Sequence, residues 1–244
     1  MKTYIGREYL QVYIDFLTTR GADVSASQWM ARHGQYLQPH HEFVPFALIT
    51  PLRDEFASIT SAPLFPFQLG FFLADNVSTL LEYSLKSCHD LEEIADLSTR
   101  FNCLRSNIIT PRYHMTANCI EFELIHCLED DELWPPLLFA TAALTYGFLH
   151  RIFGDDCQGR FTLAVASPQP HSFAAIAAQI PFAIQFNSAR DCIAIDAAWL
   201  MLVNPANDPR LKDLLLQAVL EKSRHMQRSG AIVILEIDIG TGFY

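Results

Sequence analysis

The chain has 244 residues, of which 50% are hydrophobic and 18% are charged, so it can bury a large core in one domain or two modest ones, and disorder is excluded. Its formal net charge of −10 argues against direct binding to nucleic acid, because basic side chains supply most of that affinity. The longest apolar segment, Leu137 to Leu149, is shorter than the roughly 18 residues of a membrane span.

The N-terminus and the cysteines indicate the compartment. Met1 to Tyr4 open an amphipathic stretch, which is not the pattern of a signal peptide. The six cysteines form no CxxC pair and mostly lie among apolar residues, which favours buried free thiols over a zinc cage. We therefore expect a cytoplasmic protein with no membrane partner.

The first third of the chain is predicted to be helical. Apolar residues recur at helical spacing from Tyr9 to Leu17, and Gly21 follows as a stop signal. Ser25 with Gln28 forms a capping box before a short helix that ends near Gly34. Further helices are predicted over residues 43–59, 76–86 and 90–104.

The last two of these helices each have an apolar side that should face inward. Ser87 is placed to cap the second of them. The expected inward residues are Val77, Leu80, Leu81 and Tyr83 in the first helix, and Leu91, Ile94, Ala95, Leu97 and Phe101 in the second.

The second half of the chain changes to the period of β-strands. Alternation over residues 108–114 and 120–124 predicts two strands joined as a hairpin near 116–118. A long apolar helix should run from Leu133 to Phe153, with Gly154 closing it. Short strands over 160–166, 182–186 and 192–195 and a small helix over 171–179 complete the pattern. The predicted fold is α+β: an N-terminal helical layer, then a mixed or antiparallel sheet packed against the long helix.

This pattern predicts one large unit followed by a linker. Residues 1–203 form the unit, with a helical part over 1–104 and an α+β part over 105–203. Residues 204–228 are polar, carry five basic and three acidic residues over 205–228, and predict a linker helix that starts at Asp208-Pro209. Residues 229–244 form an atypical, β-prone tail.

Three blocks resemble a known family. The first is Phe67 to Gly70 with the helix pair that ends at Phe101; the second is the strand–hairpin–helix run from Ile108 to Phe153; the third runs from Ile184 through Trp199 to Asn204-Pro205-Ala206-Asn207-Asp208-Pro209. In order and spacing they resemble the N-terminal effector-binding domain of AraC-type transcription regulators, of the subfamily labelled "arabinose-binding". The resemblance covers about Tyr9 to Gln227.

The resemblance implies a small organic effector, although the label does not identify it. It also implies a homodimer and a C-terminal helix-turn-helix domain, which would need roughly another hundred residues. After Arg228 the chain offers only a β-prone tail, so we expect that domain to be absent and DNA to be contacted only through it.

We find no catalytic constellation. The sequence has no GxSxG, HExxH, P-loop or GxGxxG motif, so we expect neither an enzyme nor a cofactor. His33, His40 and His41 either bind a metal ion or lie in a solvated loop.

The candidate ligand site is aromatic. The predicted lining is Phe67, Phe71 and Phe72, beside Phe65 around Gly70, with Tyr113, Phe122 and Tyr146. The alternative is that these side chains are ordinary core. In the strands, Arg112 and Arg160 either face inward to pair with a ligand carboxylate or face solvent. His114 either donates to a ligand or bonds within the sheet.

The sequence and the resemblance lead to two hypotheses about function. The leading hypothesis is a sensor that relays effector binding through the linker helix. The alternative is a protein-interaction module without a small ligand, dimerising through the N-terminal helices or the long helix.

Overall fold

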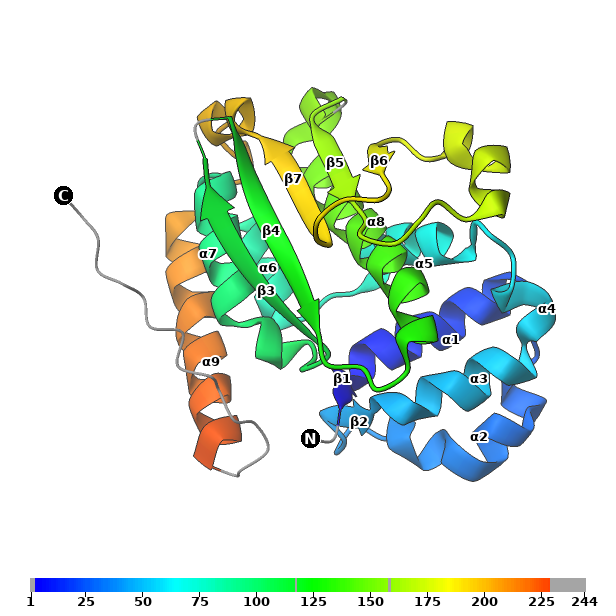
Figure 1. Cartoon of the computed structure of the whole chain (residues 1–244). Coiled ribbons are helices and arrows are strands. Elements are labelled where there is room, and N and C mark those ends of the chain that lie inside the picture. Colours follow the sequence, from blue (N-terminus) through cyan, green and yellow to red (C-terminus); the bar gives the residue numbers. More distant parts are fainter. Residues whose placement is uncertain (1–2, 117, 158, 229–244) are drawn as a thin grey trace.

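A five-stranded sheet organises the second half of the chain in the computed structural model, which describes residues 3–116, 118–157 and 159–228. Its strands, in spatial order, are β3 (Ile109–Met115), β4 (Cys119–His126), β7 (Cys192–Asp196), β5 (Phe161–Ala164) and β6 (Ala183–Gln185). Neighbouring strands are antiparallel except β5 and β6, which are parallel. The long helix α8 (Trp134–Phe153) covers one face (Figure 1). The prediction of a mixed α+β fold is confirmed.

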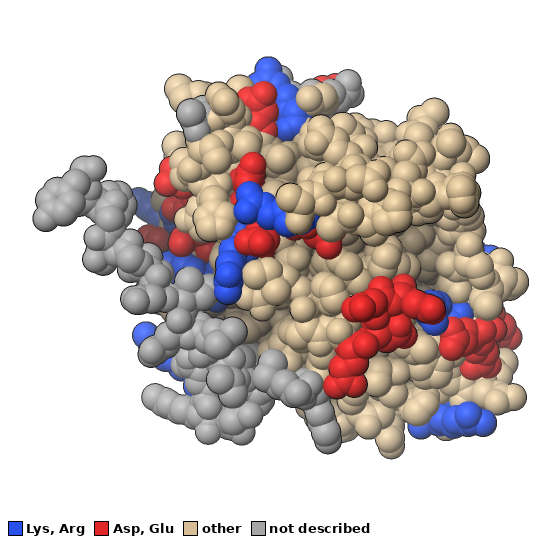
Figure 2. Space-filling view, in the orientation of Figure 1, with Lys and Arg blue, Asp and Glu red and all other residues tan. Residues whose placement is uncertain are grey.

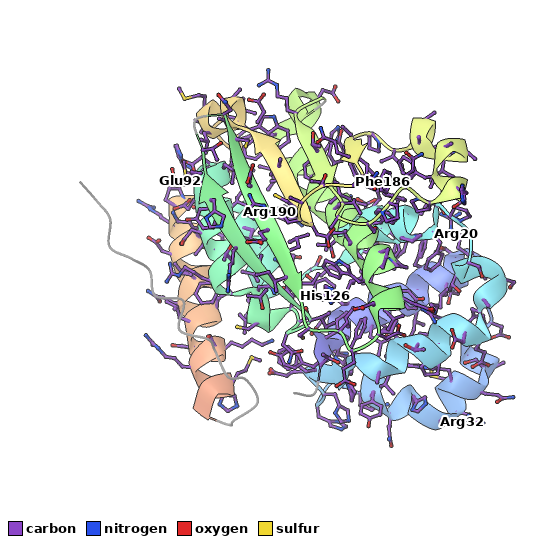
Figure 3. All side chains as sticks on the ribbon, viewed as in Figure 1. Arg20, Arg32, Glu92, His126, Phe186 and Arg190 are labelled. Atoms are coloured by element: carbon purple, nitrogen blue, oxygen red, sulfur yellow. The ribbon has the colours of Figure 1, made fainter. Side chains whose placement is uncertain are left out.

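Alternation along the strands gives the sheet a core face and an outer face. In β4, Ile120 and Phe122 are buried in the core, whereas Glu121 turns the other way. The partner of Glu121 is Arg190, which precedes β7 and lies over the outer face (Figure 3). The glutamates of β4 therefore lie on the outer face, and polar groups that face the core come mainly from the helices and turns.

Helix α5 (Phe65–Asn76) crosses α8 at very close range. A Cβ placed on Gly70 would lie 2.3 Å from the carbonyl oxygen of Ala140 and 2.9 Å from the amide of Leu144. Only glycine permits this approach. We did not predict this helix, because α5 is apolar nearly all round and shows no helical period.

The N-terminal segment forms a second core below the sheet (Figure 1). Its helices are α1 (Arg7–Thr19), α2 (Gln28–His33), α3 (Ile49–Glu55) and α4 (Ala57–Thr60). The prediction of one helix over 43–59 is wrong. Phe43–Pro45 is strand β2, which pairs with β1 (Tyr4–Gly6), and Phe56 separates α3 from α4. Pro45 keeps Val44 out of the helical conformation, and pairing with β1 makes the segment a strand.

Helices α6 (Leu80–Lys86) and α7 (Leu91–Arg100) follow α5. The first starts at Leu80 rather than at residue 76, because α5 runs through Asn76. Its predicted inward face is wrong in part: Leu80 is 39% exposed and Tyr83 is 49% exposed. The predicted inward face of the next helix is buried throughout.

The N-caps of two helices are not the residues predicted but residues close to them in sequence. The cap of α7 is Asp90 rather than Ser87, and it accepts a hydrogen bond of 2.9 Å from the Glu93 amide. The cap of α2 is Ser27 rather than Ser25, and it accepts a bond of 3.0 Å from Met30. In both places the residue directly before the first helical turn takes the position, as capping geometry requires.

Helix α9 (Pro209–Arg228) packs along α6 with Val219 buried between them. Short 3-10 helices occupy Val24–Ala26, Gly34–Leu37, Phe46–Leu48, Asn102–Leu104, Asp131–Leu133, Gly154–Cys157, His171–Ala175, Ala177–Gln179 and Ala197–Met201. The predicted small helix over 171–179 is therefore two 3-10 turns. In the described ranges no helix has the length and apolarity to cross a membrane. The predicted tail, 229–244, lies outside the described residues.

Candidate ligand-binding cavity

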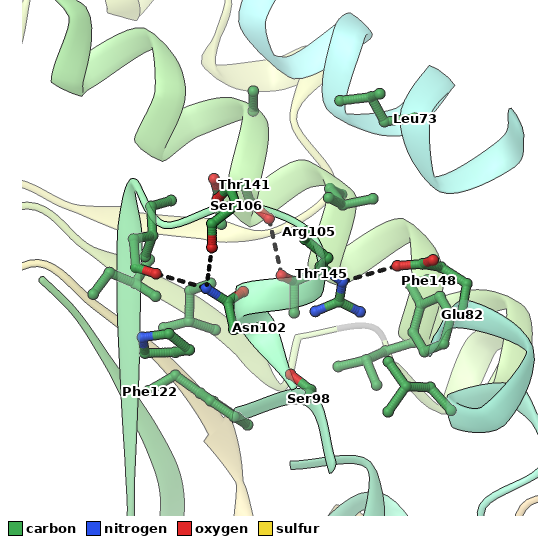
Figure 4. Close-up of a pocket in the computed structure, with 18 of the residues that line it drawn as sticks. Leu73, Glu82, Ser98, Asn102, Arg105, Ser106, Phe122, Thr141, Thr145 and Phe148 are labelled. Atoms are coloured by element: carbon green, nitrogen blue, oxygen red, sulfur yellow. Dashed lines mark hydrogen bonds and ion pairs between the residues drawn. The ribbon is translucent and has the colours of Figure 1, made fainter. Parts of the chain in front are cut away.

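A cavity of about 190 Å³ lies between the core face of the sheet, α8 and the pair α6–α7 (Figure 4). Most of its wall is apolar. The sheet contributes Phe122, Leu124, Ile193 and Ile195, and the helices contribute Leu85, Leu91, Ile94 and Leu73. Cavities with this lining and a few polar groups are typical small-molecule sites.

One side of α8 forms a wall of the cavity. The residues on this side recur every three or four positions, as one face of a helix does. They are Leu137, Ala140, Thr141, Leu144, Thr145 and Phe148. The hydroxyl of Thr145 donates to the carbonyl of Thr141 at 2.9 Å, so this polar group is satisfied within the helix. The other sides of α8 pack on the sheet and on α5.

The polar end of the cavity is built around Glu82, whose side chain is only 6% exposed. Its Oε1 accepts hydrogen bonds from the hydroxyl of Tyr9 at 2.7 Å and from Nε of Arg105 at 2.8 Å. Its Oε2 accepts a bond from the hydroxyl of Thr79. Helices α1 and α6 and the turn after residues 102–104 therefore meet at one carboxylate.

Burial and these contacts fix the charges at this end. Burial, together with the negative charge of Glu82, raises the pKa of Tyr9 well above its usual value, so the phenol is a neutral donor. Burial disfavours the charge of Arg105, but Tyr9 and Glu82 outweigh it and raise the pKa of the guanidinium. Arg105 is therefore a permanent cation at the cavity wall.

Donors and acceptors remain for a guest at this end. Arg105 donates from Nε to Glu82 at 2.8 Å and also interacts with the hydroxyl of Tyr9, and its side chain is 21% exposed. The amide of Asn102 donates to the carbonyl of Ile109 at 2.6 Å, which leaves its oxygen as an acceptor (Figure 4). Ser98 and Ser106 add hydroxyls to the same wall.

Of the residues predicted for the ligand site, Phe122 lines this cavity. Phe67 lies in the core and stacks on Phe139, with centroids 4.9 Å apart. Tyr146 is also core and meets Phe161 edge-on at 5.4 Å. These two positions fit the alternative that the aromatic cluster is ordinary core.

The other predicted aromatic residues lie apart from the cavity. Phe71 meets Tyr146 edge-on at 6.3 Å, and Phe72 packs on Phe16 at 5.1 Å in the N-terminal core. Tyr113 is half-buried, 6.1 Å from the ring of Phe122.

The predicted polar groups face solvent. Arg112 and His114 stand opposite Glu123 and Glu121 in the register of β3 and β4, and so lie on the outer face. Arg160 precedes β5 and is exposed as well. The inward alternative for the two arginines is therefore wrong, because strand alternation places one of them outward and the other lies beyond the strand.

Two sequence signals for the cavity were missed. Thr141 and Thr145 repeat four residues apart in an otherwise apolar helix, which marks a polar stripe. Glu82 lies three residues before Leu85 and so shares its buried side of α6. Arg105 gives no such signal, because it follows a 3-10 turn without periodicity.

The surface carries mixed charge, with one long uncharged segment. On the face shown in Figure 2, basic residues are interspersed with acidic ones, and residues 161–189 carry no Lys, Arg, Asp or Glu. In the described part of the chain no group of three or more His, Cys, Asp or Glu residues could hold a metal ion. His40 and His41 stack on each other at 4.2 Å.

The fold and the site define a mixed α+β domain that encloses a largely apolar cavity with a buried ion pair at one end. No family model matches the chain, and no curated protein matches it. Among solved structures, the transcriptional regulator CdpR from Pseudomonas aeruginosa superimposes with a TM-score of 0.49 at 13% identity. The match covers 79% of this chain and 62% of that one. The chain thus spans less than two thirds of that regulator.

Proposed function

We propose that this chain is a sensor domain that binds a small organic effector in the cavity between α6, α7, α8 and the sheet. The sensor domain would belong to a transcription regulator of the AraC type, as the sequence resemblance implies. The observation that carries the proposal is the cavity itself: about 190 Å³, apolar over most of its wall, with polar groups gathered at the Arg105 end. Effector sites likewise have mostly apolar walls with a few polar groups that fix the orientation of the ligand.

The chemistry of the lining favours binding over catalysis. Glu82 holds Tyr9 and Arg105 in place through hydrogen bonds of 2.7 Å from the phenol and 2.8 Å from Nε. The raised pKa of Tyr9 moves this group away from the range in which a general base works near neutral pH. The triad therefore holds charge and orientation rather than transferring protons.

The cavity connects to α9 through its own walls. Asn204, just before α9, donates from Nδ2 to the carbonyls of Lys86 and Cys88 at 2.8 and 2.7 Å. Lys212 of α9 pairs with Glu93 of α7. An effector that favours one spacing of α6 and α7 against α8 would thereby favour one position of α9, provided that its affinity differs between the two arrangements.

Thermal shift over a library of small organic molecules tests the proposal. Thr145→Phe fills the cavity, and Thr110→Phe makes the same change outside the cavity lining, on the edge strand β3. Compounds that raise the Tm of the wild type should not raise that of Thr145→Phe and should still raise that of Thr110→Phe. The proposal fails if no compound acts and native mass spectrometry finds no small molecule on the purified protein.

A second candidate function, homodimerisation, is favoured by an exposed apolar surface at the start of α9. Met201 is 84% exposed and Leu214 is 65% exposed, and Val203 and Leu211 lie near them in sequence. The long helix α8 is a poor dimer face, because α5 and the sheet cover most of it. Light scattering decides: Leu214→Lys should shift a dimer to monomer, whereas Ile125→Lys, also at an exposed apolar position, should not.

A further inference from the structure

Arg105 is a cavity-wall cation with donors left over for a ligand. A guanidinium carries five N–H donors; that of Arg105 donates from Nε to Glu82 at 2.8 Å and also interacts with the hydroxyl of Tyr9. The two terminal Nη groups reach into the cavity (Figure 4). We propose that the effector is a small organic acid whose carboxylate binds these two groups. The inference rests on the proposed function and names its ligand class.

Glu82 meets Arg105 at Nε rather than at the Nη groups. Oε1 accepts from Tyr9 and from Nε of Arg105, and Oε2 accepts from Thr79. The carboxylate is thus held at the Nε side of the guanidinium. A ligand carboxylate can approach the Nη–Nη edge in the parallel, two-bond geometry that arginine favours.

The same arrangement selects against amines. An ammonium group at the Nη edge would face the positive charge of Arg105. A neutral amide would find donors at Arg105 and an acceptor at Asn102 but would lack the charge. A hydrogen-bonded pair of opposite charges is stronger than a pair with one neutral partner, and we expect an advantage of about tenfold for the acid over its amide.

The apolar walls and the volume define the rest of the ligand. A cavity of about 150 Å³ holds benzene, with its six carbons; scaled to about 190 Å³, the guest has about eight non-hydrogen atoms. Beyond the carboxylate lie Leu85, Phe122 and Phe148, which suit a short alkyl chain or one aromatic ring. Hexanoate and benzoate are therefore suitable probes.

Calorimetric titration of the full chain with hexanoate, benzoate and their amides tests the inference. The wild type should bind each acid about tenfold more tightly than its amide. Arg105→Lys keeps a cation beside Glu82 but loses the paired donors. It should reduce the ratio of acid affinity to amide affinity to about threefold or less. Arg112→Gln, at an exposed arginine, should leave the ratio unchanged.

The outcomes separate the two proposals. If the amides bind as tightly as the acids, or if Arg105→Lys keeps the ratio, the carboxylate assignment falls while the cavity remains a ligand site. If only neutral compounds from the library stabilise the protein, the carboxylate assignment also falls and the cavity remains a ligand site. If no compound of any class binds, both proposals fall. Because the ratio is also measured on the wild type, a misfolded Arg105 variant would still leave the inference open to refutation.

Discussion

Tyr9 links the N-terminal helix to the buried ion pair. Its hydroxyl donates to Glu82 at 2.7 Å, beside the bond from Arg105. Tyr9→Phe should lower the free energy of unfolding by about 1–3 kcal/mol, because a buried carboxylate loses one donor. Urea unfolding measures this. Tyr83→Phe, at an exposed tyrosine, should change stability by about 0.5 kcal/mol or less; equal effects of the two changes would contradict the network.

Arg105, the cation of the cavity, could not be predicted from the sequence, and the reason lies in local geometry. Alternation in a strand fixes the side of Arg112 only once the core face is known. Arg105 follows a 3-10 turn, where no period exists and the direction of the side chain depends on tertiary packing. The sequence offered an arginine toward a ligand carboxylate as one of two alternatives at Arg112 and Arg160, whereas the site proposed from the structure uses Arg105.

The cysteines should differ strongly in reactivity. Burial, with the negative charge of Glu93, raises the pKa of Cys88 to about 12; burial with Glu121 raises that of Cys192 to about 11. Cys127 is exposed. Because the thiolate is the nucleophile, iodoacetamide at pH 8 should modify Cys127 in the native protein well before Cys88 and Cys192, as peptide mass mapping would show. Comparable labelling of Cys88 would mean that its surroundings open readily.

At the scale of elements, the close crossing of α5 and α8 limits Gly70. A Cβ there would meet backbone atoms of α8 at 2.3 and 2.9 Å, so Gly70→Ala should cost about 1–3 kcal/mol or more in thermal or urea unfolding. Gly147→Ala is the matched change on the facing helix. Its Cβ would lie 3.0 Å from the Ala74 side chain, and we expect a smaller loss. A neutral Gly70→Ala would show that the helices can separate at low cost.

Helix α7 depends on its cap at Asp90. Burial alone would raise the pKa of Asp90, but the hydrogen bond from the Glu93 amide and the contact with His89 outweigh it and lower the pKa below its usual value. The stabilisation is therefore present above the ordinary carboxyl pKa of about 4 and is lost as pH falls through the lowered value.

Asp90→Ala should lower stability by about 1 kcal/mol at pH 7, and the difference from wild type should shrink toward pH 3. Asp90→Asn, which keeps a capping oxygen, should lose much less at pH 7. Urea unfolding across this pH range measures both. A difference that grows on acidification would contradict a lowered pKa at Asp90.

Elements with a clear period were predicted, and those without one were missed. The β3–β4 hairpin, α8 and α9 follow from strand and helix patterns and from Pro209 and Gly154. Helix α5 escaped because α8 lies on one side of it and α1 on the other, so nearly every position is apolar. Strand β2 escaped because its three residues pair with residues 4–6, a contact that no local pattern encodes.

At the scale of the whole molecule, the cavity lies at the junction of the two parts that the sequence predicted. Tyr9, Glu82 and Arg105 come from the helical part or its end, whereas Phe122 and the α8 stripe come from the α+β part. A ligand there contacts both parts at once. A ligand that binds one spacing of the two parts more tightly than another would favour that spacing, which is what a sensor requires.

Asn204 attaches α9 to this junction. Its side chain is buried, and it bonds to the carbonyls of Lys86 and Cys88 at the turn between α6 and α7. Asn204→Ala should leave the carbonyls of Lys86 and Cys88 without this donor and loosen α9, so amides over residues 210–226 should exchange about tenfold faster by mass spectrometry, while those of α8 should not change.

Asn207→Ala is the matched control, since the Oδ1 of Asn207 is buried without a partner among the described residues; it should leave exchange in α9 close to that of the wild type. If Asn204→Ala accelerated exchange in α8 as much as in α9, the loss would be global and the attachment would not be local. If neither region changed, α9 would be held by its other contacts, such as Val219 and the Lys212–Glu93 pair. Faster exchange in α9 alone would support the proposed relay. It would show that the Asn204 contact couples α9 to the cavity wall and can be weakened without unfolding the cavity itself.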